Sequence, residues 1–135
     1  MDKMENIGLI GYGVIGKAIA KSLMKSNYHV FVYDNSESEM ILAKKQGCFT
    51  CVSPKDVSLK TKIILLSLPS PKAILDVVGN EIHGILKSAT ADTIIIDTST
   101  VDPETSKINA SKCSLKDIRY TDSPILGRPE FVGNW

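Results

Sequence analysis

Three glycines near the start of the chain have the spacing of a phosphate-binding loop. Segment 11–16 reads G-x-G-x-x-G, directly follows an apolar run at 6–10 and opens a helical pattern. In such a loop the first glycine allows a tight turn, the second lets a pyrophosphate approach the backbone, and the third lets the helix pack closely on the sheet. The N–H groups of the helix N-terminus would hold the phosphates. The predicted cofactor contacts in this loop are Gly11, Tyr12, Gly13, Val14, Ile15 and Gly16.

An acidic residue stands where a dinucleotide site needs one. Asp34 follows an apolar run at 29–33, about 20 residues beyond the glycine loop, and its carboxylate can accept hydrogen bonds from both hydroxyls of an adenosine ribose. The same charge would repel a 2′-phosphate, and the next residues, Asn35 and Ser36, offer no arginine to receive one. Asp34 and Asn35 are therefore predicted to contact NAD, with NADP the less favoured cofactor. The alternative is a glycine-rich packing turn beside a solvated aspartate.

The elements that must position these residues alternate along the chain. Apolar runs separated by helical patterns are typical of a parallel sheet with helices on both faces. We therefore predict an α/β fold, a single doubly wound (Rossmann) domain over 1–135, with about six strands in the order 3-2-1-4-5-6. The unbroken apolar runs at 62–68 and 93–97 predict strands buried on both faces. The predicted strands are 6–10, 29–33, 48–51, 62–68, 93–97 and 117–126.

Capping residues indicate where the helices begin. Ser53-Pro54, Ser70-Pro71 and Asp102-Pro103 each place an oxygen-bearing N-cap before a proline at the first helical position. Ser36-Glu37-Ser38-Glu39 has the pattern of a capping box. Two of the proline-marked starts directly follow a buried strand. Helix N-termini are thus expected at the carboxyl edge of the sheet, where doubly wound folds bind ligands.

Composition narrows the classes of partner. The 135 residues carry a formal net charge of +1, which argues against nucleic acid or an acidic membrane surface as the main partner. No apolar run approaches the length of about 20 residues that a membrane span needs. Three cysteines without disulfide-scaffold density indicate a reducing cytoplasm. The C-x-x-C of Cys48 and Cys51 lacks a second ligand pair, so we predict buried, inert thiols rather than a zinc or redox site, and no metal.

A family resemblance is carried by three segments: the glycine loop with its strand (8–16), Leu66-Ser67-Leu68-Pro69-Ser70, and the D-x-S-T-x-x-P motif at 97–103. They resemble the 3-hydroxyacid dehydrogenase superfamily, which includes 6-phosphogluconate dehydrogenase, hydroxyisobutyrate dehydrogenase and imine reductases. The resemblance implies that Ser99 hydrogen-bonds the substrate near the nicotinamide and that Thr100 lies beside cofactor and substrate. From the residues alone, both would be interpreted as loop or capping residues. The residues implied to lie beside the adenosine half of the cofactor are Leu68, Pro69 and Ser70.

A fourth segment departs from the commonest family pattern. Many relatives read D-A-P-V-S-G-G where this chain reads D-S-P-I-L-G-R from position 122, so Leu126 replaces a serine and Arg128 replaces a glycine. The resulting G-R-P-E resembles a subgroup close to the imine reductases. The expected substrate is therefore a small hydroxy acid or a related carbonyl or imine compound. Gly127 and Arg128 are expected to contact it, with Arg128 either clamping a substrate anion or lying solvated in a loop.

The resemblance also implies machinery that no segment matches. The family's general acid/base is a lysine on a helix of a second, all-helical domain. Lys107, Lys112 and Lys116 belong to the predicted helix after Ser99 or to the turn beyond it, so no catalytic residue is assigned. We expect a dinucleotide-binding domain that is truncated at its C-terminal end. By itself it should have little or no activity. Whether it forms a homodimer is left open. The alternatives are a stand-alone NAD(H)-binding or regulatory module and a purely structural α/β domain.

Overall fold

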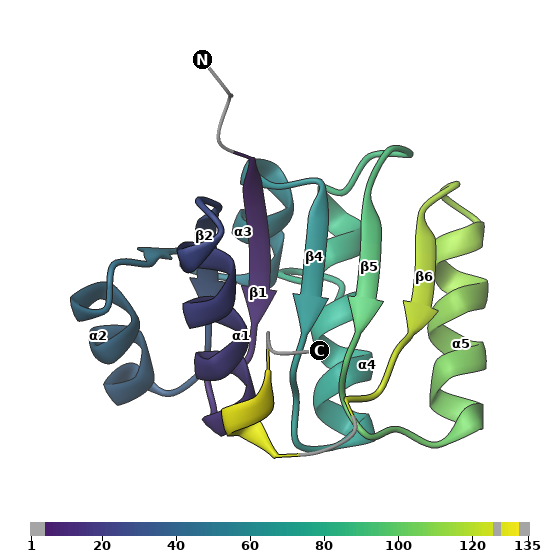
Figure 1. Ribbon diagram of the computed structural model, residues 1–135. Coiled ribbons are helices and arrows are strands. Elements are labelled where there is room, and N and C mark those ends of the chain that lie inside the picture. Colours follow the sequence, from purple (N-terminus) through teal and green to yellow (C-terminus); the bar gives the residue numbers. More distant parts are fainter. Residues whose placement is uncertain (1–4, 126–127, 133–135) are drawn as a thin grey trace.

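One parallel sheet organises the molecule. The structure, a computed structural model, describes residues 5–125 and 128–132. Its strands lie in the order β3-β2-β1-β4-β5-β6 and every neighbouring pair is parallel (Figure 1). The predicted α/β fold and strand order are therefore confirmed. The strands are β1 (Asn6–Ile10), β2 (His29–Tyr33), β3 (Phe49–Thr50), β4 (Ile63–Leu66), β5 (Ile94–Asp97) and β6 (Arg119–Asp122).

The register of the central strands brings three loops to one level. Ile10 at the end of β1 is in register with Tyr33 of β2 and with Leu66 of β4. The next residue on each strand leaves the sheet at its carboxyl edge, so Gly11, Asp34 and Ser67 begin neighbouring loops. Side chains far apart in the sequence are thereby placed around a single point.

Helices cover both faces of the sheet and bury two separate cores. On one face α1 and α2 pack over β1, β2 and β3, with Leu9, Val30 and Val32 fully buried beneath them. On the other face α3, α4 and α5 cover a core that includes Ile64 and Ile95 (Figure 1). The helices are α1 (Val14–Lys25), α2 (Glu37–Lys45), α3 (Pro54–Lys60), α4 (Pro71–Gly79) and α5 (Pro103–Ser114), with short 3-10 helices at Ile85–Lys87 and Pro129–Phe131.

The prediction that β4 and β5 are buried on both faces is wrong for one face. Ile63, Leu65, Ile94 and Ile96 point to the α1 side and are only partly buried, whereas the alternate residues on these strands are fully buried. The reason is placement, because α1 packs on β1 and β2 rather than over β4 and β5. These four isoleucine and leucine side chains form a half-covered apolar face.

All four predicted helix starts are confirmed, and at three of them the N-cap side chain forms the expected hydrogen bond. Ser53, Ser70 and Asp102 are the N-caps of α3, α4 and α5, and each side chain accepts a hydrogen bond from the N–H three residues on, at 2.9–3.1 Å. The predicted capping box at Ser36 is wrong. Ser36 does precede α2, but its side chain makes no cap. The carboxylate of Asp34 takes the Ser36 N–H at 2.8 Å, and Glu39 pairs with Lys17 of α1 instead.

The sixth strand is shorter than the predicted 117–126 for two backbone reasons. Asp117 has a left-handed backbone, with φ at 56°, so the strand begins after it. Pro124 has no N–H for the ladder, and the last bond to β5 is from Ser123 N–H to the Asp97 carbonyl at 2.7 Å. The short 3-10 helix at Pro129–Phe131 lies against α1 (Figure 1), and Val132 packs against the core under α1.

The three cysteines are free and buried, as predicted. Burial raises the pKa of Cys48, and it raises those of Cys51 and Cys113 to about 11, which disfavours the reactive thiolate. The described residues contain no group of three or more histidine, cysteine or acidic side chains suited to a metal ion. Among the same residues, no helix has the length and apolar character that crossing a bilayer requires.

Candidate dinucleotide-binding site

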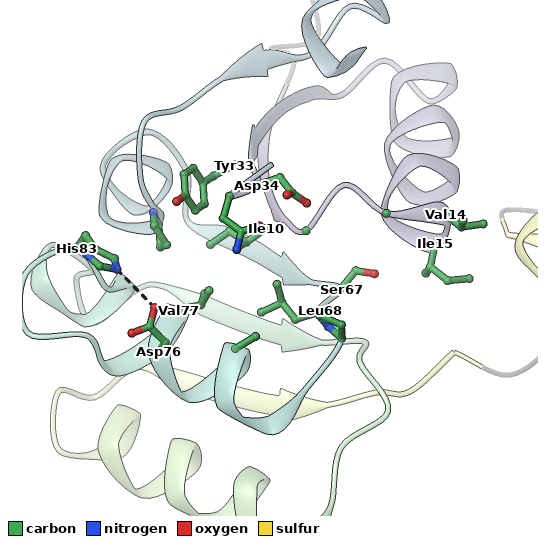
Figure 2. Close-up of a pocket in the computed structure, with 16 residues that line it drawn as sticks. Ile10, Val14, Ile15, Tyr33, Asp34, Ser67, Leu68, Asp76, Val77 and His83 are labelled. Atoms are coloured by element: carbon green, nitrogen blue, oxygen red, sulfur yellow. Dashed lines mark hydrogen bonds and ion pairs between the residues drawn. The ribbon is translucent and has the colours of Figure 1, made fainter. Parts of the chain in front are cut away.

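A cavity of about 480 Å³ lies at the carboxyl edge of the sheet, where the loops after β1, β2 and β4 meet. Figure 2 shows Val14 and Ile15 of α1 at one end and His83 at the other, with Asp34 and Leu68 between them. Half of its lining consists of residues predicted to contact the cofactor. These are Gly11, Gly13, Val14, Ile15, Asp34, Asn35, Leu68 and Pro69.

Each glycine of the loop has a different surrounding. A Cβ on Gly11 would lie 1.9 Å from the Ser67 carbonyl oxygen, and its φ of 101° disfavours any other residue. A Cβ on Gly16 would lie 2.1 Å from the Gly11 carbonyl oxygen, so the start of α1 packs directly on the loop. Around Gly13 a Cβ would meet nothing within 4 Å. Protein packing therefore requires glycine at 11 and 16, whereas the space at 13 is open to the cavity.

The N-terminus of α1 is available to an anion. Gly13 is its N-cap and has no side chain to accept a hydrogen bond, and its first turn carries no acidic residue. The first N–H groups of a helix have no partner within the helix and carry partial positive charge. An uncapped helix start facing a cavity is suited to hold a phosphate.

The carboxylate of Asp34 is fixed by two backbone donors. One oxygen accepts the Tyr12 N–H at 2.7 Å and the other accepts the Ser36 N–H at 2.8 Å. Each carboxylate oxygen can accept a further hydrogen bond, so the side chain remains an acceptor towards the cavity. These contacts also tie the glycine loop to the loop after β2.

Tyr12 is placed differently from its neighbours in the loop. Its ring is 1% exposed and lies in the core under α1 and α2 rather than in the cavity lining. Its hydroxyl hydrogen-bonds Gln46 at the end of α2, and the Lys17 ammonium lies 5.7 Å from the ring centroid. Burial raises the pKa of Tyr12 well above its usual value, so the hydroxyl stays protonated. The side chain therefore anchors the loop, and only the backbone of Tyr12 lies near Asp34.

The loop after β4 contributes apolar surface. Leu68 and Pro69 line the cavity, whereas Ser70 does not and gives its hydroxyl oxygen to the Ala73 N–H at 3.1 Å. The Leu68 N–H donates to the hydroxyl oxygen of Ser99 at 2.9 Å. This bond joins the loop after β4 to the loop after β5.

Asp97 organises the loop that contains the predicted substrate contacts. It is fully buried and accepts the Ser99 N–H at 3.0 Å and the Tyr120 hydroxyl at 2.7 Å. Burial, and secondarily this bond, raises the pKa of Tyr120, so the phenol remains a donor. Ser99 is 5% exposed and Thr100 is exposed, and neither lines the cavity. The D-x-S spacing was the signal for this role of Asp97, which the sequence interpretation did not assign.

The last predicted contacts lie beyond β6. Arg128 is exposed, and its guanidinium lies 3.9 Å from a carboxylate oxygen of Glu130. Arg128 does not line the cavity, although the segment it opens packs against α1. Gly127, like Leu126, lies outside the described residues.

The end of the cavity away from Gly13 was missed by the sequence interpretation. Its polar groups are Asp76 of α4 and His83, whose Nε2 lies 3.5 Å from an Asp76 carboxylate oxygen (Figure 2). A hydrogen bond from Asn80 at 2.8 Å, and then the contact with His83, lowers the pKa of Asp76. The only sequence signal was the helical spacing of Ala73, Asp76 and Val77. The remaining lining residues outside the predictions are Ile10, Tyr33, Pro54 and Ser67.

Comparison with known proteins agrees with this geometry. The family described as the NAD binding domain of 6-phosphogluconate dehydrogenase matches residues 6–132, and the chain belongs to that family. The 2-(hydroxymethyl)glutarate dehydrogenase of Eubacterium barkeri is 34% identical over 127 residues, which are 94% of this chain and 42% of that protein. The chain is thus an NAD-binding domain of this family, and it is similar to the corresponding part of that dehydrogenase.

Solved structures share the fold at low sequence identity. The 3-hydroxyisobutyrate dehydrogenase of Mycobacterium tuberculosis, with L-serine, has a TM-score of 0.87 at 17% identity, covering 98% of this chain and 44% of that one. An imine reductase variant of Myxococcus stipitatus in complex with NAD⁺ has a TM-score of 0.86 at 16% identity, covering 96% and 43%. The chain spans less than half the length of these relatives.

Proposed function

We propose that this chain binds NAD as the cofactor half of an oxidoreductase acting on a small hydroxy acid or a related carbonyl or imine compound. The observation that carries the proposal is the open space at Gly13, at the uncapped start of α1, in the same cavity as the Asp34 carboxylate. Nothing in the protein's own packing calls for glycine at 13. A pyrophosphate at this position gives the reason, because it must approach the backbone closely.

The preference for NAD over NADP rests on charge. Asp34 is held as an acceptor by two backbone N–H groups, which suits ribose hydroxyls and repels a 2′-phosphate. The cavity-lining residues of the described chain include Asp34 and Asp76 but no lysine or arginine. A 2′-phosphate would therefore enter a site without a cation to pair with it.

The substrate would lie beside the loops after β5 and β6. When bound, the nicotinamide supplies hydride transfer. Ser99, whose hydroxyl oxygen already accepts the Leu68 N–H, retains its own hydrogen to donate to a substrate oxygen. Thr100, Gly127 and Arg128 complete the proposed substrate contacts. The proton partner is proposed to be a lysine from outside this chain, and Lys112 and Lys116 line a different cavity.

Calorimetric titration with NADH and NADPH tests the proposal. We expect NADH to bind at least about tenfold more tightly, because each 1.4 kcal/mol of repulsion at Asp34 is a factor of ten. Asp34→Ala should remove most of that preference. As a matched control, Asp92→Ala removes an exposed aspartate that pairs with Lys62 outside the cavity, and it should leave both affinities unchanged. No binding of either cofactor at millimolar concentration would refute the proposal.

A further inference from the structure

The cavity has three zones in a fixed order, and the third has no assigned ligand group. Gly13 and Val14 line the phosphate end and Asp34 lies in the middle. Asp76 and His83 lie at the opposite end (Figure 2). If the proposed function holds, the group bonded to the ribose beside Asp34 is the base, which must extend towards Asp76 and His83.

The walls of this end suit a flat ring. Tyr33, the last residue of β2, and Val77 of α4 lie near His83 and Asp76 (Figure 2). Pro54 and Ala73 also line the cavity. These side chains offer apolar surface on which a base can pack. His83 adds a further planar ring.

The polar groups at this end are held in place by Asn80. Its side-chain nitrogen Nδ2 donates to one oxygen of Asp76 at 2.8 Å. Its side-chain oxygen Oδ1 accepts the backbone N–H groups of Ile82 and His83 at 2.9 and 3.1 Å. One residue thus holds the Asp76 carboxylate and the backbone of His83. The side chains of Asp76 and His83 remain 57% and 45% exposed, so both are accessible to a ligand.

We propose that Asp76 reads the base of the dinucleotide by accepting a hydrogen bond from the 6-amino group of adenine. In adenine this amino group lies on the six-membered ring, on the side away from the glycosidic bond. A base that enters from the ribose therefore presents that edge to the far end of the cavity. A carboxylate accepts but cannot donate, so it pairs with an amino group and repels the 6-oxo oxygen of hypoxanthine.

The experiment compares two dinucleotides that differ only at this edge. NAD⁺ and nicotinamide hypoxanthine dinucleotide are titrated into the full chain by calorimetry. We expect NAD⁺ to bind about tenfold more tightly, as for one hydrogen bond replaced by repulsion. In Asp76→Asn, the amide oxygen can keep the bond from Asn80 while its N–H group faces the base. The preference should then vanish or reverse, because that N–H can donate to the 6-oxo oxygen.

The controls separate the possible results. Asp92→Asn makes the same chemical change on an exposed aspartate outside the cavity and should keep the preference. Because the readout is a ratio within one protein, partial unfolding of a variant does not alter it. Equal affinities in the unaltered chain, or a tenfold preference that persists in Asp76→Asn, would overturn the assignment while leaving cofactor binding intact. Failure of both dinucleotides to bind would instead refute the proposed function, and this inference with it.

Discussion

The helices α1 and α4 follow neighbouring strands, but only α4 has a side chain that caps its first N–H groups. α4, after β4, begins at Ser70, whose hydroxyl oxygen accepts the Ala73 N–H at 3.1 Å. The N-cap residue of α1, which follows β1, is Gly13, and it has no side chain that could accept a hydrogen bond from the first turn. Both starts lie at the carboxyl edge of the sheet. The protein therefore caps one helix start with a side chain and leaves the other uncapped beside the cavity.

The contrast extends to the other helices on the α4 side. α3 and α5 begin at Ser53 and Asp102, and both side chains form caps. Among the five α-helices of the described residues, the N-cap residues of α1 and α2 make no side-chain cap, and at α2 the Asp34 carboxylate accepts the N–H of the N-cap residue Ser36. The start of α1 differs in that its N-cap residue, Gly13, lines the cavity. Substitutions in the glycine loop and at the capped helix starts therefore test this difference.

The largest expected effect is a loss of stability when a side chain is added at Gly16, where α1 packs on the glycine loop. Gly16→Val places a Cβ 2.1 Å from the Gly11 carbonyl oxygen, a backbone atom that cannot move alone because Gly11 itself contacts Ser67. We expect the free energy of unfolding to fall by about 3 kcal/mol or more in urea denaturation. Gly13→Ala is the matched control, because its Cβ meets nothing within 4 Å and stability should hold or rise slightly. Equal losses in both variants would contradict this account.

Giving α1 a cap should separate stability from binding. In Gly13→Asp the carboxylate can accept a first-turn N–H, as Asp102 does for α5. Stability should rise by a few tenths of a kcal/mol, while NADH affinity should fall by about 100-fold or more because a fixed negative charge occupies the phosphate position. Thermal denaturation and calorimetry measure the two quantities. Gly13→Asn, a cap without charge, should lose less affinity, and full retention of NADH binding in Gly13→Asp would place the phosphates elsewhere.

Removing the cap of α4 should lower stability and leave NADH affinity nearly unchanged. Ser70→Ala loses the bond to Ala73 and is expected to lower the free energy of unfolding by about 1 kcal/mol, with NADH affinity changed less than about twofold. Ser53→Ala should cost a similar amount at α3. The family resemblance implied that Ser70 contacts the cofactor. A large loss of NADH affinity in Ser70→Ala at unchanged stability would favour that role over the cap.

The smallest expected effect is on how stability falls at acidic pH. Hydrogen bonds from Thr105 lower the pKa of Asp102, so the folded chain binds this proton less readily than the unfolded chain. The resulting stabilisation is present above the unfolded pKa of about 4 and is lost as the pH falls through the lower folded value. Asp102→Asn should therefore flatten the fall in melting temperature below about pH 4, without changing NADH affinity at neutral pH. An unchanged slope would show that the carboxylate is not what titrates there.

Local chemistry explains which features could be predicted from the sequence. Ser53, Ser70 and Asp102 were identified because a cap needs only the residues that follow it. The capping box at Ser36 failed because Asp34, held by the glycine loop, reaches the same N–H first. That competition depends on a contact between β1 and β2 that no local pattern contains.

The end of the cavity lined by Asp76 and His83 shows the same limit more strongly. Asp76 and His83 meet only because α4 ends at Asn80 and the chain turns back through it. Neither residue belongs to a motif. The half-covered face of β4 and β5 was likewise hidden, since an apolar run does not specify where the neighbouring helix will pack.

Tyr12 has a thermodynamic consequence for ligand capture. Its ring is buried in the core and its hydroxyl hydrogen-bonds Gln46, which anchors the glycine loop to α2. Its backbone N–H donates to the Asp34 carboxylate. The conformational entropy of this loop is therefore lost when the chain folds, not when a dinucleotide arrives. Such preorganisation leaves more of the interaction free energy for affinity. Loosening this anchor should accordingly weaken binding through an unfavourable entropy change, with the ligand contacts themselves unaltered.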